Sequence, residues 1–151
     1  MKSEYKGVIF FNADTVHIDI SNDKHTFSYI TGIAWFELPN FFYKLSLLYK
    51  GEIGEGKLYC HGNGDYYIYS TDGSNLKIEH VDDYYGQNHR ITYYFDLKKY
   101  LDAVVDSFKA YINSDENKAI FPLNESDKYH PLNDEVLKAF YEFSSLLREL
   151  D

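Results

Sequence analysis

The chain has 151 residues, a length that suits one domain, and we expect residues 1–151 to form a single domain. Hydrophobic residues make up 44% and charged residues 26%, with only 9 Gly, 3 Pro and 1 Cys, which excludes disordered, collagen-like and disulfide-rich classes. The net charge is -9, and residues 101–151 carry 11 acidic and 5 basic side chains. Such a chain repels phosphate backbones, so we expect a basic protein partner and no nucleic acid. An acidic composition that only maintains solubility is the alternative.

The N-terminal segment lacks the apolar stretch of a signal peptide, and no run approaches the roughly 20 apolar residues that cross a bilayer. We therefore expect a cytoplasmic protein with no membrane contact. Cys60 is the only cysteine, so an internal disulfide is excluded.

In the first third of the chain, alternating apolar and polar residues predict three strands. These strands are Tyr5–Phe11, Thr15–Ser21 and His25–Ile30. The apolar spacing then changes to three and four residues, which predicts a helix from Trp35 to Lys50. Pro39 is expected in the first turn of this helix and Gly51 just past its end.

Short apolar runs separated by turn signals predict a second group of strands joined as a meander. These strands are Gly56–His61, Asp65–Thr71, Asn75–Val81 and His89–Phe95, with turns at Gly62-Asn63-Gly64 and Asp72-Gly73-Ser74 and a loop at Asp82–Asn88. Two more helices are expected, with Asp96 and Asn133 as N-caps, and the irregular segment that joins them is expected to dock on the body of the protein through Ile120, Phe121 and Leu123. The fold class is therefore predicted as α+β: a single antiparallel (meander) β-sheet of about six or seven strands, with about three helices packed on one face.

The alternation in the meander predicts which side chains face the core and which face outward. The expected core face holds Leu58, Cys60, Ile68, Leu76, Ile78, Ile91 and Phe95. The expected outer face mixes tyrosine with charge: Lys57, Tyr59, His61, Tyr67, Tyr69, Lys77, Glu79, Arg90, Thr92 and Tyr94. Tyrosine is enriched at protein interfaces, and the neighbouring segment Asp82–Tyr85 is both acidic and aromatic. The predicted partner-binding residues are Asp82, Asp83, Tyr84, Tyr85, Tyr67, Tyr69, Glu79 and Tyr94. Alternatively, the tyrosines only stabilise a solvated sheet.

The sequence holds no recognised catalytic signature, and we expect no enzyme activity, no cofactor and no metal. His17 and Asp19 share one strand face and could supply two metal ligands, but this spacing is common on any half-exposed strand. Cys60 and His61 are adjacent, so their side chains should point to opposite faces, which disfavours a nucleophile pair. Cys60 is interpreted as a small core residue.

Three segments in order carry a resemblance to a known group of proteins: LSLLYKG, GKLYCHGNGDYYIYSTDGSNLKIEH and ITYYFDLKKYLDAVVDSFKAYI, which together span roughly residues 35–112. Their layout resembles that of small immunity proteins from bacterial polymorphic-toxin systems, including those paired with LXG-type secreted toxins. The resemblance implies a cytosolic antitoxin that binds the C-terminal domain of a cognate toxin and blocks it. The resemblance does not assign a function to any individual residue of this chain.

The hypothesis is therefore an immunity protein, monomeric or weakly dimeric, that blocks the active site of a basic, nuclease-type toxin domain. One alternative is a small-molecule-binding or enzymatic α+β domain, with a pocket between the meander and the first helix that uses His61, His80 or His89. The other is a homo-oligomeric regulatory protein that pairs through the tyrosine-containing outer face of the meander.

Overall fold

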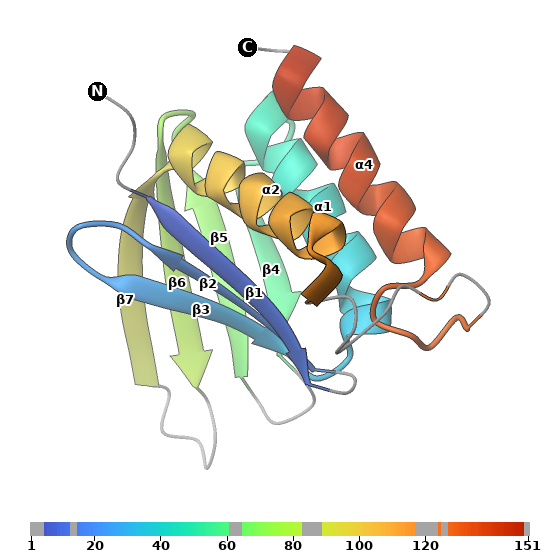
Figure 1. The fold of residues 1–151 in the computed structure, drawn as a ribbon. Helices are drawn as coiled ribbons and strands as arrows, with labels where there is room; N and C mark the ends of the chain where they lie inside the picture. Colours follow the sequence, from blue (N-terminus) through green and yellow to red (C-terminus); the bar gives the residue numbers. More distant parts are fainter. Residues whose placement is uncertain are drawn as a thin grey trace.

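The computed structural model describes residues 5–12, 15–60, 65–82, 89–116, 124 and 127–149. In this part of the chain, seven strands and three long helices form around one continuous hydrophobic core (Figure 1). The strands are β1 (Lys6–Asn12), β2 (Thr15–Ser21), β3 (Thr26–Thr31), β4 (Glu55–Tyr59), β5 (Asp65–Thr71), β6 (Asn75–Asp82) and β7 (His89–Asp96). The helices are α1 (Ala34–Lys50), α2 (Leu97–Asn113) and α4 (Asp134–Glu149).

The strands form two antiparallel sheets, β1-β2-β3 and β4-β5-β6-β7. The α+β class is confirmed, whereas the expectation of a single sheet is wrong. A side chain takes the place of a neighbouring strand at the free edge of β3. The Tyr67 hydroxyl accepts a hydrogen bond from the Ile30 amide at 3.2 Å and donates to the Ile30 carbonyl at 3.4 Å. The amide and carbonyl of Ile30 are thereby satisfied without pairing to β4.

The three-stranded sheet lies across the four-stranded sheet, and aromatic rings fill the space between them (Figure 1). Phe27 of β3 contacts Tyr67 edge-to-face at 5.3 Å and Tyr93 at 4.9 Å between ring centroids. Tyr29 stacks on Phe41 of α1 at 4.4 Å. Because Val16, Ile18 and Ile20 alternate with polar residues along β2, the sequence buries one face of the first sheet, as predicted.

Helix α1 begins one residue before the predicted start and ends at the predicted Lys50. Gly51 follows in the left-handed conformation with φ of 75°, and its amide donates to the carbonyl of Leu48 at 3.2 Å. Pro39 is the sixth residue of the helix and not part of the first turn as expected. It therefore removes one amide from the helix interior.

Helices α2 and α4 begin at the predicted caps. Asp96 accepts a hydrogen bond from the Lys99 amide at 3.0 Å, and Asn133 accepts one from the Val136 amide at 2.9 Å. Helix α2 packs on β1 so closely that a Cβ atom added at Gly7 would lie 2.8 Å from the carbonyl oxygen of Ala103. The glycine thus sets the distance between α2 and the first sheet.

The free edge of β7 is closed by the turn between β2 and β3. Asn22 Nδ2 and His25 Nε2 both donate to the backbone carbonyl of Tyr94, at 3.3 and 2.9 Å. An edge covered in this way is protected from pairing with another chain.

Some sequence predictions fall outside the described residues: the turn Gly62-Asn63-Gly64 and the apolar patch Ile120, Phe121 and Leu123. None of the helices in the described ranges has both the length and the hydropathy of a transmembrane segment.

Candidate functional site

Two of the predicted partner-binding residues lie in the core. Tyr67 is 1% exposed and Tyr69 is fully buried, so their assignment to the outer face is wrong. Both side chains point inward: the Tyr67 hydroxyl binds the backbone of Ile30 on β3, and the Tyr69 hydroxyl meets that of Tyr100 on α2 at 2.7 Å. Ile68, expected in the core, is half-buried on the opposite face. Tyr67 and Tyr69 are therefore structural residues.

Glu79 and Tyr94 do lie on the outer face of the four-stranded sheet, as expected. Tyr94 is 60% exposed, and Glu79 forms ion pairs with Arg90 at 3.1 Å and Lys77 at 3.7 Å. Lys57 adds a further cation to this face, above the ring of Tyr66. Among the described residues, this outer face of the four-stranded sheet therefore carries charges of both signs and is not acidic.

Seven of the described carboxylates lie at or beside the ends of elements that meet at one end of the molecule, the lower end in Figure 1. Antiparallel pairing brings the end of β6 beside the starts of β5 and β7. The Thr31 hydroxyl, at the end of β3, donates to the Cys60 carbonyl at 2.7 Å, which places the start of α1 at the same end. Phe11 of β1 contacts Tyr111 near the end of α2 at 5.1 Å, and Trp35 contacts Tyr129, ahead of α4, at 4.8 Å.

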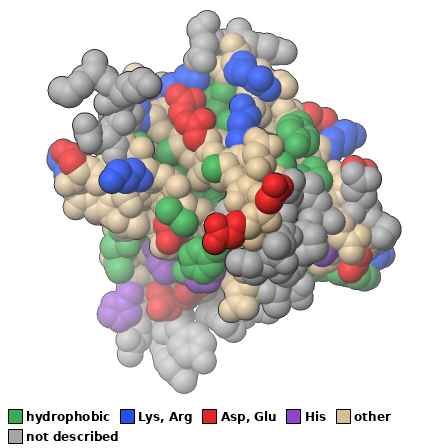
Figure 2. All heavy atoms as spheres, viewed as in Figure 1, with side chains coloured by type: hydrophobic (Ala, Val, Ile, Leu, Met, Phe, Trp, Pro, Cys, Tyr) green, Lys and Arg blue, Asp and Glu red, His purple; other side chains and the backbone are tan. Residues whose placement is uncertain are grey.

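We call this region the acidic end. Its described carboxylates are Asp65, Asp82, Asp115, Glu116, Asp127, Asp134 and Glu135. Cations lie close to them in the chain: Lys128 follows Asp127, Arg90 is near the start of β7, and Lys138 is one helical turn after Asp134 on α4. Figure 2 shows acidic and histidine side chains next to each other near the lower ends of β6 and β7. Clustered charge of one sign attracts an oppositely charged surface and accelerates its approach.

Three aromatic side chains form a cluster at the acidic end, in which Trp35 is half-buried and the other two are exposed. Trp35 contacts Phe36 at 5.6 Å and Tyr129 at 4.8 Å, both edge-to-face. Phe36 is 61% exposed and Tyr129 is 53% exposed, although both belong to residue types that favour burial. Trp and Tyr are also the side chains that most often dominate binding energy at protein interfaces.

The segment that holds Tyr129 is fixed by local hydrogen bonds. Asp127 accepts from the Tyr129 amide at 3.0 Å, and its backbone carbonyl accepts from the His130 amide at 3.0 Å. The His130 ring accepts from the Leu132 amide at 2.9 Å, and Asn133 Nδ2 donates to the Lys128 carbonyl. A binding segment ordered in advance loses less conformational entropy when a partner docks.

Asp82, the described member of the predicted Asp82–Tyr85 motif, lies at the acidic end, whereas Asp83, Tyr84 and Tyr85 lie outside the described residues. Its carboxylate neighbours Asp65 on β5, and His80 Nε2 lies 3.4 Å from Asp65 Oδ2. Burial, followed by the hydrogen bond with Asp82, raises the pKa of Asp65. Burial likewise raises the pKa of the nearby Cys60 thiol to about 11.

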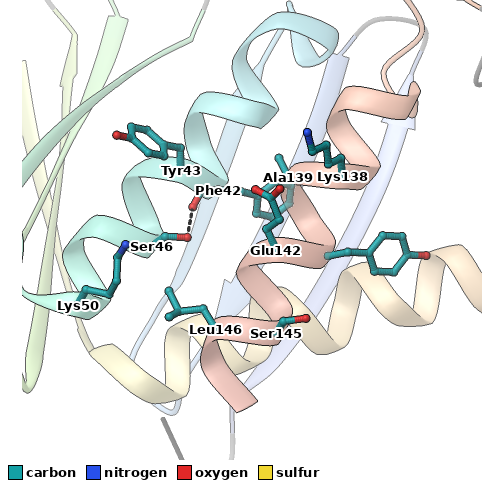
Figure 3. A pocket seen from close by; sticks show the side chains of 10 residues that line it. Phe42, Tyr43, Ser46, Lys50, Lys138, Ala139, Glu142, Ser145 and Leu146 are labelled. Atoms are coloured by element: carbon teal, nitrogen blue, oxygen red, sulfur yellow. Dashed lines mark hydrogen bonds between the residues drawn. The ribbon is translucent and has the colours of Figure 1, made fainter. Parts of the chain in front are cut away.

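A groove of about 740 Å³ runs between α1 and α4 (Figure 3). Tyr43, Ser46 and Lys50 line it from α1, and Lys138 and Glu142 are among the residues that line it from α4. The groove is open, and its described lining contains no histidine. It differs in position and in chemistry from the histidine pocket considered as an alternative from the sequence.

Sequence reasoning missed the aromatic cluster of Trp35, Phe36 and Tyr129. One signal was present: Trp35 and Phe36 lie off the apolar stripe of α1, which buries Leu38, Phe41, Phe42, Leu45 and Leu48. Tyr129 offered no such signal, because it belongs to no periodic element.

Comparison with known proteins yields no relative: no family model, curated protein or solved structure matches this chain.

Proposed function

We propose that this protein is a cytosolic immunity protein that binds a basic, nuclease-type toxin domain of a bacterial polymorphic-toxin system and blocks its active site. The observation that carries the proposal is the acidic end, where carboxylates from several segments lie at the same end of the molecule as the half-buried ring of Trp35 and the exposed rings of Phe36 and Tyr129. A nuclease cleft is lined with cations that bind phosphate, so a surface of clustered carboxylates complements it.

The carboxylates and the aromatic rings have different parts in this mechanism. Exposed charges such as Glu116 and Glu135 attract the basic domain and accelerate the encounter. Trp35 and Tyr129 lose their exposure when the partner docks and hold the complex together. Neither part requires a chemical step on this chain, which agrees with an inhibitor that acts by covering a cleft.

The test is co-expression with the toxin domain encoded beside this gene, followed by association kinetics on the purified pair. We expect the chain to protect cells and to form a stable complex. The charge-reversed variant Glu116→Lys/Glu135→Lys should bind about tenfold more slowly at low salt, because steering is weakened. The matched control Asp23→Lys/Glu55→Lys makes the same change in net charge at exposed positions away from the acidic end.

The control variant should keep the association rate, whereas equal slowing in both variants would remove the acidic end from the interface. Trp35→Ala should instead accelerate dissociation, with a loss of at least about 2 kcal/mol in binding. Failure of every neighbouring toxin domain to bind the chain would refute the proposed function itself.

Glu79 and Tyr94 remain predicted contacts on a second surface, the outer face of the four-stranded sheet. Tyr94→Ala measures their part separately, because Tyr94 is exposed and its side chain lies outside the core cluster. Weaker toxin binding would extend the interface from the acidic end to this face. Unchanged binding would confine it to the acidic end.

A further inference from the structure

Three side chains with metal-ligating atoms converge at the acidic end, on the side of the four-stranded sheet that faces β3. The Cys60 thiol, a carboxylate oxygen of Asp65 and a ring nitrogen of His80 lie within 4.8 Å of one another. They come from the end of β4, the start of β5 and the end of β6, and all three are half-buried. No metal is expected from the sequence, where His17 and Asp19 are weighed as possible ligands and Cys60, Asp65 and His80 are not considered together.

The spacing of these atoms suits a shared ion. Zinc bonds to sulfur, nitrogen and oxygen ligands are 2.0–2.3 Å long, so two ligands of one tetrahedral ion lie about 3.3–3.8 Å apart. His80 Nε2 and Asp65 Oδ2 are 3.4 Å apart, which is long for a direct hydrogen bond but suits two ligands of the same ion. The Cys60 sulfur lies within 4.8 Å of the other two ligand atoms, so it would need to approach them by at most about 1 Å to reach the spacing of ligands on one ion.

The backbone already holds two of the ligands in place. The Cys60 carbonyl accepts from the Thr31 hydroxyl at 2.7 Å and from the Gly32 amide at 3.1 Å. The Cys60 amide donates to the Asp65 carbonyl at 3.4 Å. The ring of Tyr67 lies against His80 with centroids 4.8 Å apart, which limits the orientations of the imidazole. Ligands that are fixed before the ion arrives bind it with little reorganisation.

We propose that Cys60, Asp65 and His80 bind a divalent cation of the zinc class. A water molecule completes the tetrahedron, and Asp82 is a positioning residue: it keeps the proton that the two carboxyl groups share and donates it in a hydrogen bond to the metal-bound Asp65 carboxylate. A thiolate together with an imidazole selects zinc or a similar borderline-soft ion over calcium and magnesium, which prefer oxygen ligands. This inference does not depend on the proposed toxin partner.

Binding of the cation is coupled to the loss of a proton from the protein. The Cys60 thiol releases its proton to solvent, the sulfur donates an electron pair to the cation, and neutral His80 donates its free ring nitrogen. The competing reading, a Cys–His–Asp catalytic triad, requires a thiolate in the free protein. The rate of alkylation of Cys60 separates the two, because only the thiolate is strongly nucleophilic.

The test is titration of the purified full-length chain with Co²⁺, which takes zinc sites and reports its ligands by absorption. We expect a thiolate-to-cobalt charge-transfer band, visible bands typical of four ligands, and the loss of both when Zn²⁺ is added. Zn²⁺ should also raise the melting temperature, because an ion that binds only the folded state stabilises it.

Cys60→Ser should abolish the charge-transfer band, and Asp65→Asn and His80→Gln should each weaken Co²⁺ binding by more than about 100-fold. Asp82→Ala should weaken it by about 10–100-fold with the charge-transfer band retained, because only the hydrogen bond that supports a ligand is lost. The matched control is His17→Gln/Asp19→Asn, a histidine and an aspartate that share the outer face of the first sheet. It should bind Co²⁺ as the unaltered chain does.

Two outcomes would overturn the proposal. The first is Co²⁺ binding that gives no thiolate band. Equal Co²⁺ affinity in the Asp65→Asn variant and in the control variant would have the same meaning, once circular dichroism shows that both variants are folded. The second is rapid alkylation of Cys60 by iodoacetamide that Zn²⁺ does not slow, which would indicate a reactive nucleophile and not a ligand.

Discussion

The hydroxyl groups of Tyr69 and Tyr100 meet at 2.7 Å inside the core, and both residues are fully buried. Each hydroxyl satisfies the other in a region that is otherwise apolar. A buried hydroxyl that loses its partner has a cost in stability that a paired one avoids. The two residues therefore act as one unit, although they lie on β5 and α2.

We expect Tyr69→Phe and Tyr100→Phe each to lower the free energy of unfolding by about 1–3 kcal/mol, because each leaves one buried hydroxyl unpaired. The double variant should lose less than the sum of the two single losses, since it removes both polar groups. Urea denaturation of the four proteins measures the coupling. Additive losses would show that the two hydroxyls do not depend on each other.

The same burial predicts sensitivity to alkali. Burial raises the pKa of Tyr69 and of Tyr100 above the ordinary tyrosine value of about 10. Each of these tyrosines therefore loses its proton at a lower pH in the unfolded chain than in the folded protein. Their contribution to the free energy of unfolding is complete below pH ~10 and is lost as the pH rises above it. We expect the free energy of unfolding to fall between pH ~9 and ~11, and to fall less steeply in the double Phe variant. Parallel slopes in the two proteins would contradict this origin.

The tyrosines also show where sequence reasoning at this scale ends. Along β5, Tyr67 and Tyr69 alternate with Tyr66 and Ile68, so hydrophobicity alone favours turning Ile68 inward. The structure turns the tyrosines inward because their hydroxyls find partners on β3 and α2, both distant in sequence. Such partners belong to the tertiary structure and are not visible in a strand pattern.

Elements were predicted more reliably than their arrangement. Apolar spacing, caps and turn residues located every helix and strand of the described ranges within a few residues, because these signals are local. The division into two sheets was not predictable in the same way. It depends on the Tyr67 hydroxyl at the edge of β3 and on the packing of α2 on β1, both contacts between distant segments.

The close contact between α2 and β1 predicts a difference between two glycines. Gly7→Ala places a methyl group 2.8 Å from the Ala103 carbonyl, and α2 must move away from the sheet. We expect a loss of about 1–3 kcal/mol in the free energy of unfolding, as for other overpacked sites. Gly54→Ala is the control, because an added Cβ there meets no atom within 4 Å. It should change stability by about 0.5 kcal/mol or less, and an equally harmless Gly7→Ala would refute the tight contact.

Over the whole molecule, charge is distributed unevenly. The acidic end brings together carboxylates from strand ends, from the end of α2 and from the start of α4, while the outer face of the four-stranded sheet carries Lys57, Lys77 and Arg90. The net charge of -9 could be counted from the sequence, but its position could not. That position follows from which ends of the elements the fold brings together.

Like charges at one end predict that salt stabilises the free protein. Raising NaCl from about 10 mM to about 150 mM shortens the screening length from about 30 Å to about 8 Å, which weakens the repulsion. We expect the melting temperature to rise over this range. The rise should be smaller in Glu116→Gln/Glu135→Gln, in which part of the repulsion is absent. An equal rise in both proteins would place the repulsion elsewhere.

The acidic end is made of element termini and the segments that connect them, while the core lies within the strands and helices. Most of its carboxylates can therefore be exchanged without disturbing the interior. Under the proposed function, a change in the toxin domain can be matched by substitutions at Asp115, Glu116 and Glu135 while the interior of this protein stays constant. Diverged copies of this protein should accordingly keep their interior and differ first at this end.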